Sequence, residues 1–221
     1  MTTAYGSELP AEVHVPTDAQ DGVPVIILLH GRGAERTDLF SLRRSFPSGW
    51  AVIAPDAPFA AAPWGYGPGR AWYRYLGRTT PEPESFGASL TALERLIEDL
   101  PRTIGRVPGD IALGGFSQGG TVSLAYALTH PARRLNVVNF SGFLADHPEV
   151  KAERATVRGA RIFWGHGTGD PAIPFELAVE GRGLLAHAGA DLEARDYPIG
   201  HSISPDELRD AIAWLGAGMS A

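Results

Sequence analysis

Short apolar, β-branched runs alternate along this chain with longer segments whose apolar residues recur at helical spacing. The runs predict strands at Val25–Leu29, Ala51–Ala54, Ile111–Gly114, Leu135–Phe140, Arg161–Trp164 and Leu192–Tyr197. Helices are expected between them, near Asp38–Arg44, Pro83–Leu100, Gln118–Leu128, Pro174–Ala188 and Pro205–Leu215. This alternation is typical of an α/β fold, in which helices cover both faces of a mostly parallel sheet.

The segment Pro83–Leu100 shows the clearest helical pattern, and Pro101 is expected to end it. Phe86, Leu90 and Ile97 belong to one apolar stripe that would pack on the sheet. No repeat, low-complexity tract or linker divides the 221 residues. We therefore expect a single domain over residues 1–221, with no separate lid domain.

Composition excludes several classes of function. The net charge of −6 disfavours a nucleic-acid partner, because phosphate binding requires a basic face. The absence of cysteine excludes disulfides, thiolate zinc sites and a cysteine nucleophile. The first thirteen residues lack the features of a secretory signal, and the apolar run Val23–Leu29 is too short to span a bilayer. A cytoplasmic protein without integral membrane contact is the resulting expectation.

The glycine-rich stretch Gly114–Gly120, GGFSQGG, could form a phosphate-binding loop or a sharp turn that exposes its central serine. A P-loop needs Lys-Ser or Lys-Thr after its last glycine, and here Thr121 follows without a lysine. A dinucleotide-binding Gly-x-Gly-x-x-Gly turn has the wrong spacing, because residue 117 is serine. The remaining pattern, Gly-x-Ser-x-Gly, is that of a nucleophile elbow centred on Ser117 between a strand and a helix. An inert serine on a tight turn is the alternative.

A serine nucleophile needs a base, which a third group must orient. On this kind of sheet the partners follow the serine in the order acid, then histidine. His201 follows the last predicted strand, in the loop position from which a base can reach the elbow; the other histidines beyond the serine are His130, His147, His166 and His187. Asp170 follows the strand Arg161–Trp164 and is preferred as the acid over Asp196, which lies inside the last strand. The predicted triad is Ser117, Asp170 and His201.

An oxyanion hole requires two backbone N–H groups directed at the reacting carbonyl oxygen. One donor should be Gln118, the residue after the nucleophile. The other should come from the loop after an early strand, where Gly31 and Gly33 let the backbone turn inward and Arg32 N–H is the candidate. We expect His30 to stabilise this turn and to take no part in the chemistry.

The stretches LLHGRG, APDAP, AWYRY, GFSQGG, HGTGDPAIP and IGHSIS run in order from about residue 25 to 210. As a set they resemble the phospholipase/carboxylesterase family of α/β-hydrolases, which includes acyl-protein thioesterases. The resemblance implies a serine hydrolase of carboxylic esters or thioesters, with Ser117, Asp170 and His201 as triad and Arg32 and Gln118 as oxyanion donors. It implies no metal or cofactor, and a monomer or homodimer.

Two departures from that family concern the substrate. The family often has Trp-Phe-Asp where this chain has Trp72-Tyr73-Arg74, and Gly-Leu-Gly where it has Gly31-Arg32-Gly33. The aromatic loop between Pro58 and Gly87 is expected to supply the substrate pocket, with Trp64, Trp72 and Tyr73 as candidates. The alternative is that these aromatics pack on the core.

Two other functions stay open on the sequence. A non-catalytic binding protein could share the fold, and a peptidase or lipase could use the same scaffold. A complete triad counts against the binding protein, and the absence of a lid counts weakly against the peptidase and lipase.

Overall fold

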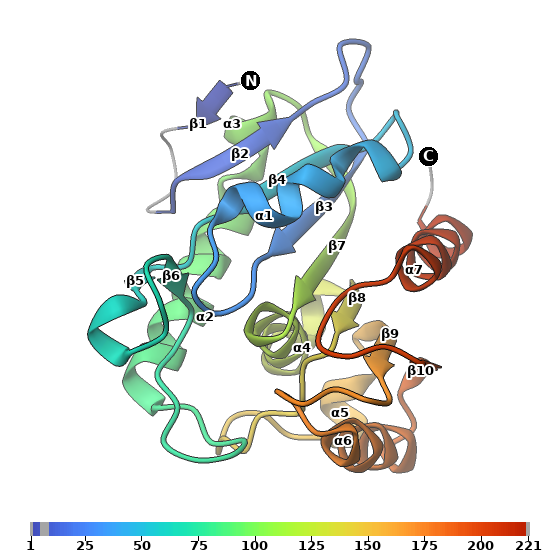
Figure 1. Cartoon of the computed structure of the whole chain (residues 1–221). Coiled ribbons are helices and arrows are strands. Elements are labelled where there is room, and N and C mark those ends of the chain that lie inside the picture. The colour runs from blue at the N-terminus through green and yellow to red at the C-terminus, as the bar shows by residue number, and fades with distance from the viewer. Residues whose placement is uncertain (1, 5–8, 220–221) are drawn as a thin grey trace.

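An eight-stranded sheet forms the centre of the computed structural model, which describes residues 2–4 and 9–219. Residues 5–8, part of the N-terminal segment in which no secretory signal was found, lie outside the described residues. The strands are β1 (Thr2–Ala4), β2 (Ala11–His14), β3 (Val23–Leu29), β4 (Ala51–Pro55), β7 (Pro108–Phe116), β8 (Leu135–Phe140), β9 (Ala160–Gly167) and β10 (Asp191–Tyr197). Figure 1 shows the sheet running from β1 and β2 at one end to β10 at the other.

The sheet order is β1-β2-β4-β3-β7-β8-β9-β10. The pairs β1/β2 and β2/β4 are antiparallel, and every other neighbouring pair is parallel. All six predicted strands are present, with β7 and β9 longer than expected. The antiparallel strands β1 and β2 were not predicted, because four residues with the pattern AEVH give little periodic signal.

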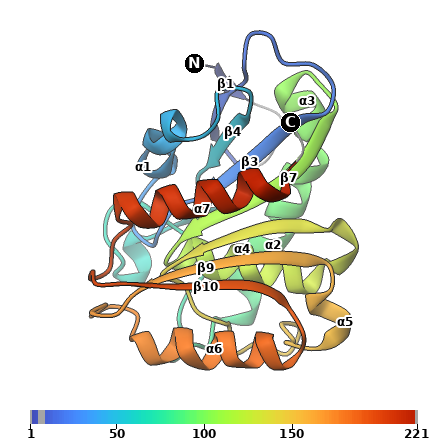
Figure 2. The same ribbon diagram turned by 90° about the vertical axis from the view of Figure 1, so that its right-hand side faces the viewer.

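Helices cover both faces of the sheet, as the sequence predicts. They are α1 (Arg36–Phe40), α2 (Pro83–Glu98), α3 (Leu100–Ile104), α4 (Gln118–Thr129), α5 (Arg154–Val157), α6 (Phe175–His187) and α7 (Pro205–Gly218). Alternate strand residues point to opposite faces, so that Ile26 and Leu28 pack with α1 and α7, whereas Val25 and Ile27 pack in the core that α2, α4 and α6 complete. In Figure 2, α7 crosses one face of the sheet and α6 lies on the other.

Two expectations about helix ends were wrong. The helix α2 ends at Glu98, and Pro101 lies near the start of α3 instead of ending the preceding helix. Proline is tolerated there because the first N–H groups of a helix have no intrahelical partner. The expected helix near Asp38–Arg44 begins earlier, as α1, and continues as a 3-10 helix over Ser41–Ser45.

The long segment after Pro58 contains a small hairpin of its strands β5 (Phe59–Ala60) and β6 (Arg70–Ala71). Within the described residues, no helix is long and apolar enough to cross a membrane. The parallel strands β3, β7, β9 and β10 all end at the same edge of the sheet, which is where ligands bind in open α/β folds.

Candidate active site

Ser117 lies on a sharp turn between β7 and α4. Its φ of 55° and ψ of −115° place it in a region that non-glycine residues rarely adopt. The turn is closed by backbone contact: a Cβ on Gly115 would lie 2.3 Å from Gly119 C, and one on Gly119 would lie 2.0 Å from Leu29 O. The two glycines of the Gly-x-Ser-x-Gly pattern are therefore required by space, and the strained turn presents the serine at the sheet edge.

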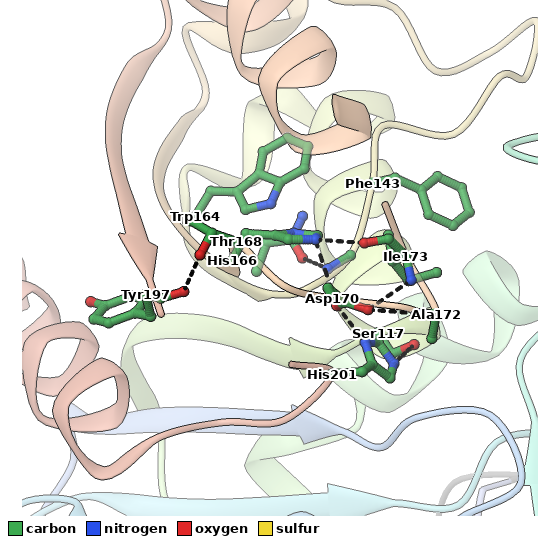
Figure 3. Close-up of polar contacts among 12 residues, drawn as sticks. Ser117, Phe143, Trp164, His166, Thr168, Asp170, Ala172, Ile173, Tyr197 and His201 are labelled. Carbon is green, nitrogen blue, oxygen red and sulfur yellow. Dashed lines mark hydrogen bonds and ion pairs between the residues drawn. The ribbon is translucent and has the colours of Figure 1, made fainter. Parts of the chain in front are cut away.

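His201 joins Ser117 to Asp170 through two hydrogen bonds (Figure 3). Its Nε2 lies 2.9 Å from Ser117 Oγ, and its Nδ1 lies 2.7 Å from Asp170 Oδ2. Because a carboxylate only accepts, Nδ1 carries the proton and Nε2 is left to accept from the serine hydroxyl. The three residues come from the ends of β7, β9 and β10, as the sequence reasoning expects, and the ring of Phe116 packs 4.7 Å from that of His201.

The loop after β9 holds Asp170 in place. Its Oδ1 accepts hydrogen bonds of 2.8 Å from the backbone N–H groups of Ala172 and Ile173, so both carboxylate oxygens have partners (Figure 3). The same loop is tied to the chain that leads to His201, because Thr168 N donates to Tyr197 O and Gly169 N donates to Ile199 O. Asp170 and His201 thus lie on two loops that are hydrogen-bonded to each other.

His166 is a buried neighbour of this acid that the sequence reasoning did not select. Its Nε2 lies 3.0 Å from Ile173 O and 3.6 Å from Asp170 Oδ2, and its Nδ1 has no hydrogen-bond partner among the described residues. Burial lowers the pKa of His166 below its usual value. A neutral His166 donates to the loop carbonyl without adding a positive charge that would compete with His201 for Asp170.

The two expected oxyanion donors come from the elbow and from the loop after β3. Gln118 is the first residue of α4, whose first N–H groups have no intrahelical acceptor. Among the described residues, the N–H of Arg32 donates no backbone hydrogen bond, whereas those of the next two residues do. The close approach of Gly119 to Leu29 O and His30 O brings the two segments together.

His30 stabilises its turn, in keeping with expectation. Its Nδ1 donates to Gly31 O at 2.7 Å, and its Nε2 accepts from Ala57 N at 3.0 Å. Burial lowers its pKa, so it is held neutral.

The three aromatic residues expected in the substrate pocket do not line the cavity at Ser117. Trp72 and Tyr73 are fully buried, and Trp72 Nε1 donates to His30 O. The Gln118 side chain fixes their backbone, accepting from Trp72 N and donating to Tyr73 O, each at 2.8 Å. Trp64 is half-buried and packs on Phe59. The expectation is therefore corrected: Trp72 and Tyr73 pack in the core, and Trp64 packs on other aromatic residues of the loop.

A cavity of about 400 Å³ opens above Ser117 and His201. The residues whose side chains shape it include Arg32, Tyr66, Tyr75, Arg78, Phe116 and Ile173. Tyr66 and Tyr75 belong to the same aromatic loop, but loop residues have no periodicity that would separate the cavity side from the core side. A larger cavity, of about 860 Å³, lies at the opposite edge beside Arg134 and Arg158 and includes no member of the triad.

Comparison with known proteins identifies the family to which the chain is similar. The family model described as phospholipase/carboxylesterase matches residues 11–217. A probable carboxylesterase of Oryza sativa subsp. japonica is 30% identical over 204 residues, which cover 86% of this chain and 76% of the rice protein. Acyl-protein thioesterase 1 of Eremothecium gossypii is 28% identical, over 96% of this chain and 94% of its own.

Solved structures show the same fold. The crystal structure of esterase PE8 has a TM-score of 0.76 and 25% identity, covering 95% of this chain and 98% of that one. A carboxylesterase from Mesorhizobium loti has a TM-score of 0.79 over 98% of each chain, and its 22% identity supports the fold alone. With the family match covering nearly all of the sequence and the expected residues gathered at the sheet edge, the chain belongs to the phospholipase/carboxylesterase family of α/β-hydrolase enzymes.

Proposed function

We propose that this enzyme cleaves carboxylic esters or thioesters through a covalent acyl-serine intermediate. The observation that carries the proposal is the continuous hydrogen-bonded chain from Ser117 Oγ through His201 to Asp170. A serine hydroxyl becomes a competent nucleophile when an adjacent base takes its proton in the attack.

In the proposed first half-reaction, His201 Nε2 accepts the proton of Ser117 as the oxygen attacks the carbonyl carbon. Asp170 holds the imidazole in the required tautomer and stabilises the imidazolium that forms. The N–H groups of Arg32 and Gln118 would stabilise the oxyanion, helped by the positive end of the α4 dipole. His201 then protonates the leaving alcohol or thiol, and the acyl group stays on Ser117.

In the second half-reaction, a water molecule takes the place of the leaving group. His201 removes a proton from the water as its oxygen attacks the acyl carbon, and the resulting oxyanion rests on the same two donors. When it collapses, the bond from the acyl carbon to Ser117 Oγ breaks, His201 returns the proton to that oxygen, and the carboxylic acid leaves.

A binding protein that lacked catalysis would place no demand on this arrangement. An Asp170 turned toward solvent would favour that function, but its side chain is buried and accepts from His201. The oligomeric state and the cytoplasmic compartment stay predictions from the sequence.

Hydrolysis of p-nitrophenyl esters from acetate to laurate tests the proposal, with Ser117→Ala assayed in parallel. We expect turnover by the parent enzyme and a fall of at least about 10⁴-fold in the variant, because the oxyanion hole alone supports little catalysis. Each buried CH₂ contributes about 0.8 kcal/mol, so the chain-length optimum reports the depth of the acyl site. Equal activity of the two proteins would refute the assignment of Ser117.

A further inference from the structure

Two arginine side chains line the cavity above Ser117. Arg32 and Arg78 come from different loops, and both are exposed. The guanidinium of Arg32 lies over two tyrosine rings, 4.8 Å from the centroid of Tyr66 and 5.4 Å from that of Tyr75. Because both rings line the same cavity, these cation–π contacts hold the positive charge at its wall.

In the part of the chain that the structure describes, no carboxylate oxygen lies within 4.0 Å of Arg32 or Arg78. Arg74, in the same loop as Arg78, does have an acidic partner, because its Nη1 lies 3.6 Å from Glu82 Oε1.

The cavity also differs from the rest of the molecule in charge. Its lining includes one acidic residue, Asp38, against the two arginines, so the charges of these three side chains sum to +1. The whole chain carries −6. A positive site on a negative protein attracts anions specifically to the place where the nucleophile lies.

We infer that the substrate carries an anionic group, a carboxylate or a phosphate, close to its ester or thioester bond. The inference rests on the proposed function and names its substrate class. A guanidinium offers a planar fork of donors that matches the oxygens of either group. Stacking on two rings already restricts the Arg32 side chain, so less rotamer freedom is lost when it binds the anion.

The reach of the side chain places this group near the scissile bond. The backbone N–H of Arg32 is the proposed oxyanion donor, so its guanidinium lies within one side-chain length of the reacting carbonyl. Apolar side chains of the lining, which include Phe116 and Ile173, can hold a short chain between the anionic group and the scissile bond. The anion can belong to the acyl half or to the leaving half of the substrate.

Two matched substrate pairs distinguish these halves. Mono-p-nitrophenyl adipate and its methyl-capped diester differ by a charge on the acyl side, and para-acetoxybenzoate and its methyl ester differ on the leaving side. In at least one pair we expect kcat/KM to favour the anionic member by about 3- to 10-fold, as partly exposed ion pairs allow. The preference should fall when salt is raised from about 20 mM to about 0.5 M, because salt screens exposed charges.

Substitution of the two arginines tests whether they cause the preference for the anionic substrate. Arg32→Gln and Arg78→Gln should each lower the ratio of anionic to neutral kcat/KM by about 3-fold, and the double variant should lower it further. Residue 32 keeps its backbone N–H in these variants. Arg102→Gln removes the same charge from an exposed position on α3 and should leave the ratio unchanged.

The outcomes separate this inference from the function on which it rests. If both neutral members are hydrolysed in a Ser117-dependent way and neither pair shows a preference, the inference is wrong and the proposed function stands. A preference that survives in the double variant also overturns it. If no ester in either pair is hydrolysed, both proposals fail.

Discussion

A buried carboxyl next to the His201 loop should make the stability of this protein fall between acid and neutral pH. Glu207 lies near the start of α7, after the N-cap residue Ser204, whose Oγ accepts from Glu207 N at 3.1 Å. Its side chain is fully buried against Gly165, and neither carboxyl oxygen has a hydrogen-bond partner among the described residues. Burial raises the pKa of Glu207 from 4.5 to about 7, although the charge of Arg182 opposes the rise.

The direction and size of the change in the free energy of unfolding follow from this change in pKa. The folded state holds its proton more tightly than the unfolded state, so the stability from this group is complete below about pH 4.5. It is lost as the pH rises through about 7. At 1.36 kcal/mol per pKa unit, the full loss is on the order of 3 kcal/mol.

Glu207→Gln removes the titration while keeping the shape of the side chain. Urea unfolding followed by circular dichroism between about pH 4.5 and about pH 8.5 should show the variant gaining roughly 3 kcal/mol relative to the parent protein as the pH rises. The exposed Glu149→Gln is the matched control and should run parallel to the parent. If the unfolding free energy of Glu207→Gln also runs parallel to that of the parent protein across this pH range, the reasoning is refuted. Glu207 would then have the same pKa in the folded and unfolded states.

Two further substitutions test the site and the elbow. Asp170→Asn should lower kcat by about 10⁴-fold with an unchanged circular dichroism spectrum, since an amide favours the wrong tautomer of His201; a loss below about tenfold would mean that another carboxylate orients the base. Gly119→Ala should destabilise the fold by about 1–3 kcal/mol or more in urea unfolding, because its Cβ would meet Leu29 O at 2.0 Å. In contrast, Gly183→Ala in α6 meets nothing within 4 Å and should stabilise by about 0.5–1 kcal/mol, and equal effects of the two would refute the steric account.

Much of the architecture could be predicted because local patterns and global fold agree. The inner parallel strands β3 and β4 are continuous apolar runs, which is what burial on both faces requires, and Ile26 and Ile27 do pack on opposite faces. Once the strands were placed, Ser117, Asp170 and His201 were expected at one edge, because parallel strands carry their carboxyl ends together. The structure brings these three side chains within hydrogen-bond distance.

The parts that the sequence did not predict depend on contacts between distant segments. Trp72 and Tyr73 lie in the core because Gln118, more than forty residues away, fixes their backbone. In an irregular loop no periodicity distinguishes such residues from Tyr66 and Tyr75, which face the cavity. His166 was passed over because its role depends on Ile173 O, a partner that only the folded loop supplies.

The most direct test of the central claim is covalent labelling with a fluorophosphonate, followed by intact-mass measurement and peptide mapping. If Ser117 is the nucleophile that His201 activates, one adduct per chain should form on Ser117. Labelling should be lost in Ser117→Ala and strongly slowed in His201→Ala. Ser141 is an informative control, because it also has a positive φ, of 53°, and its buried Oγ has no partner among the described residues. An adduct on Ser141, or labelling of Ser117 that is as fast without His201, would contradict the account.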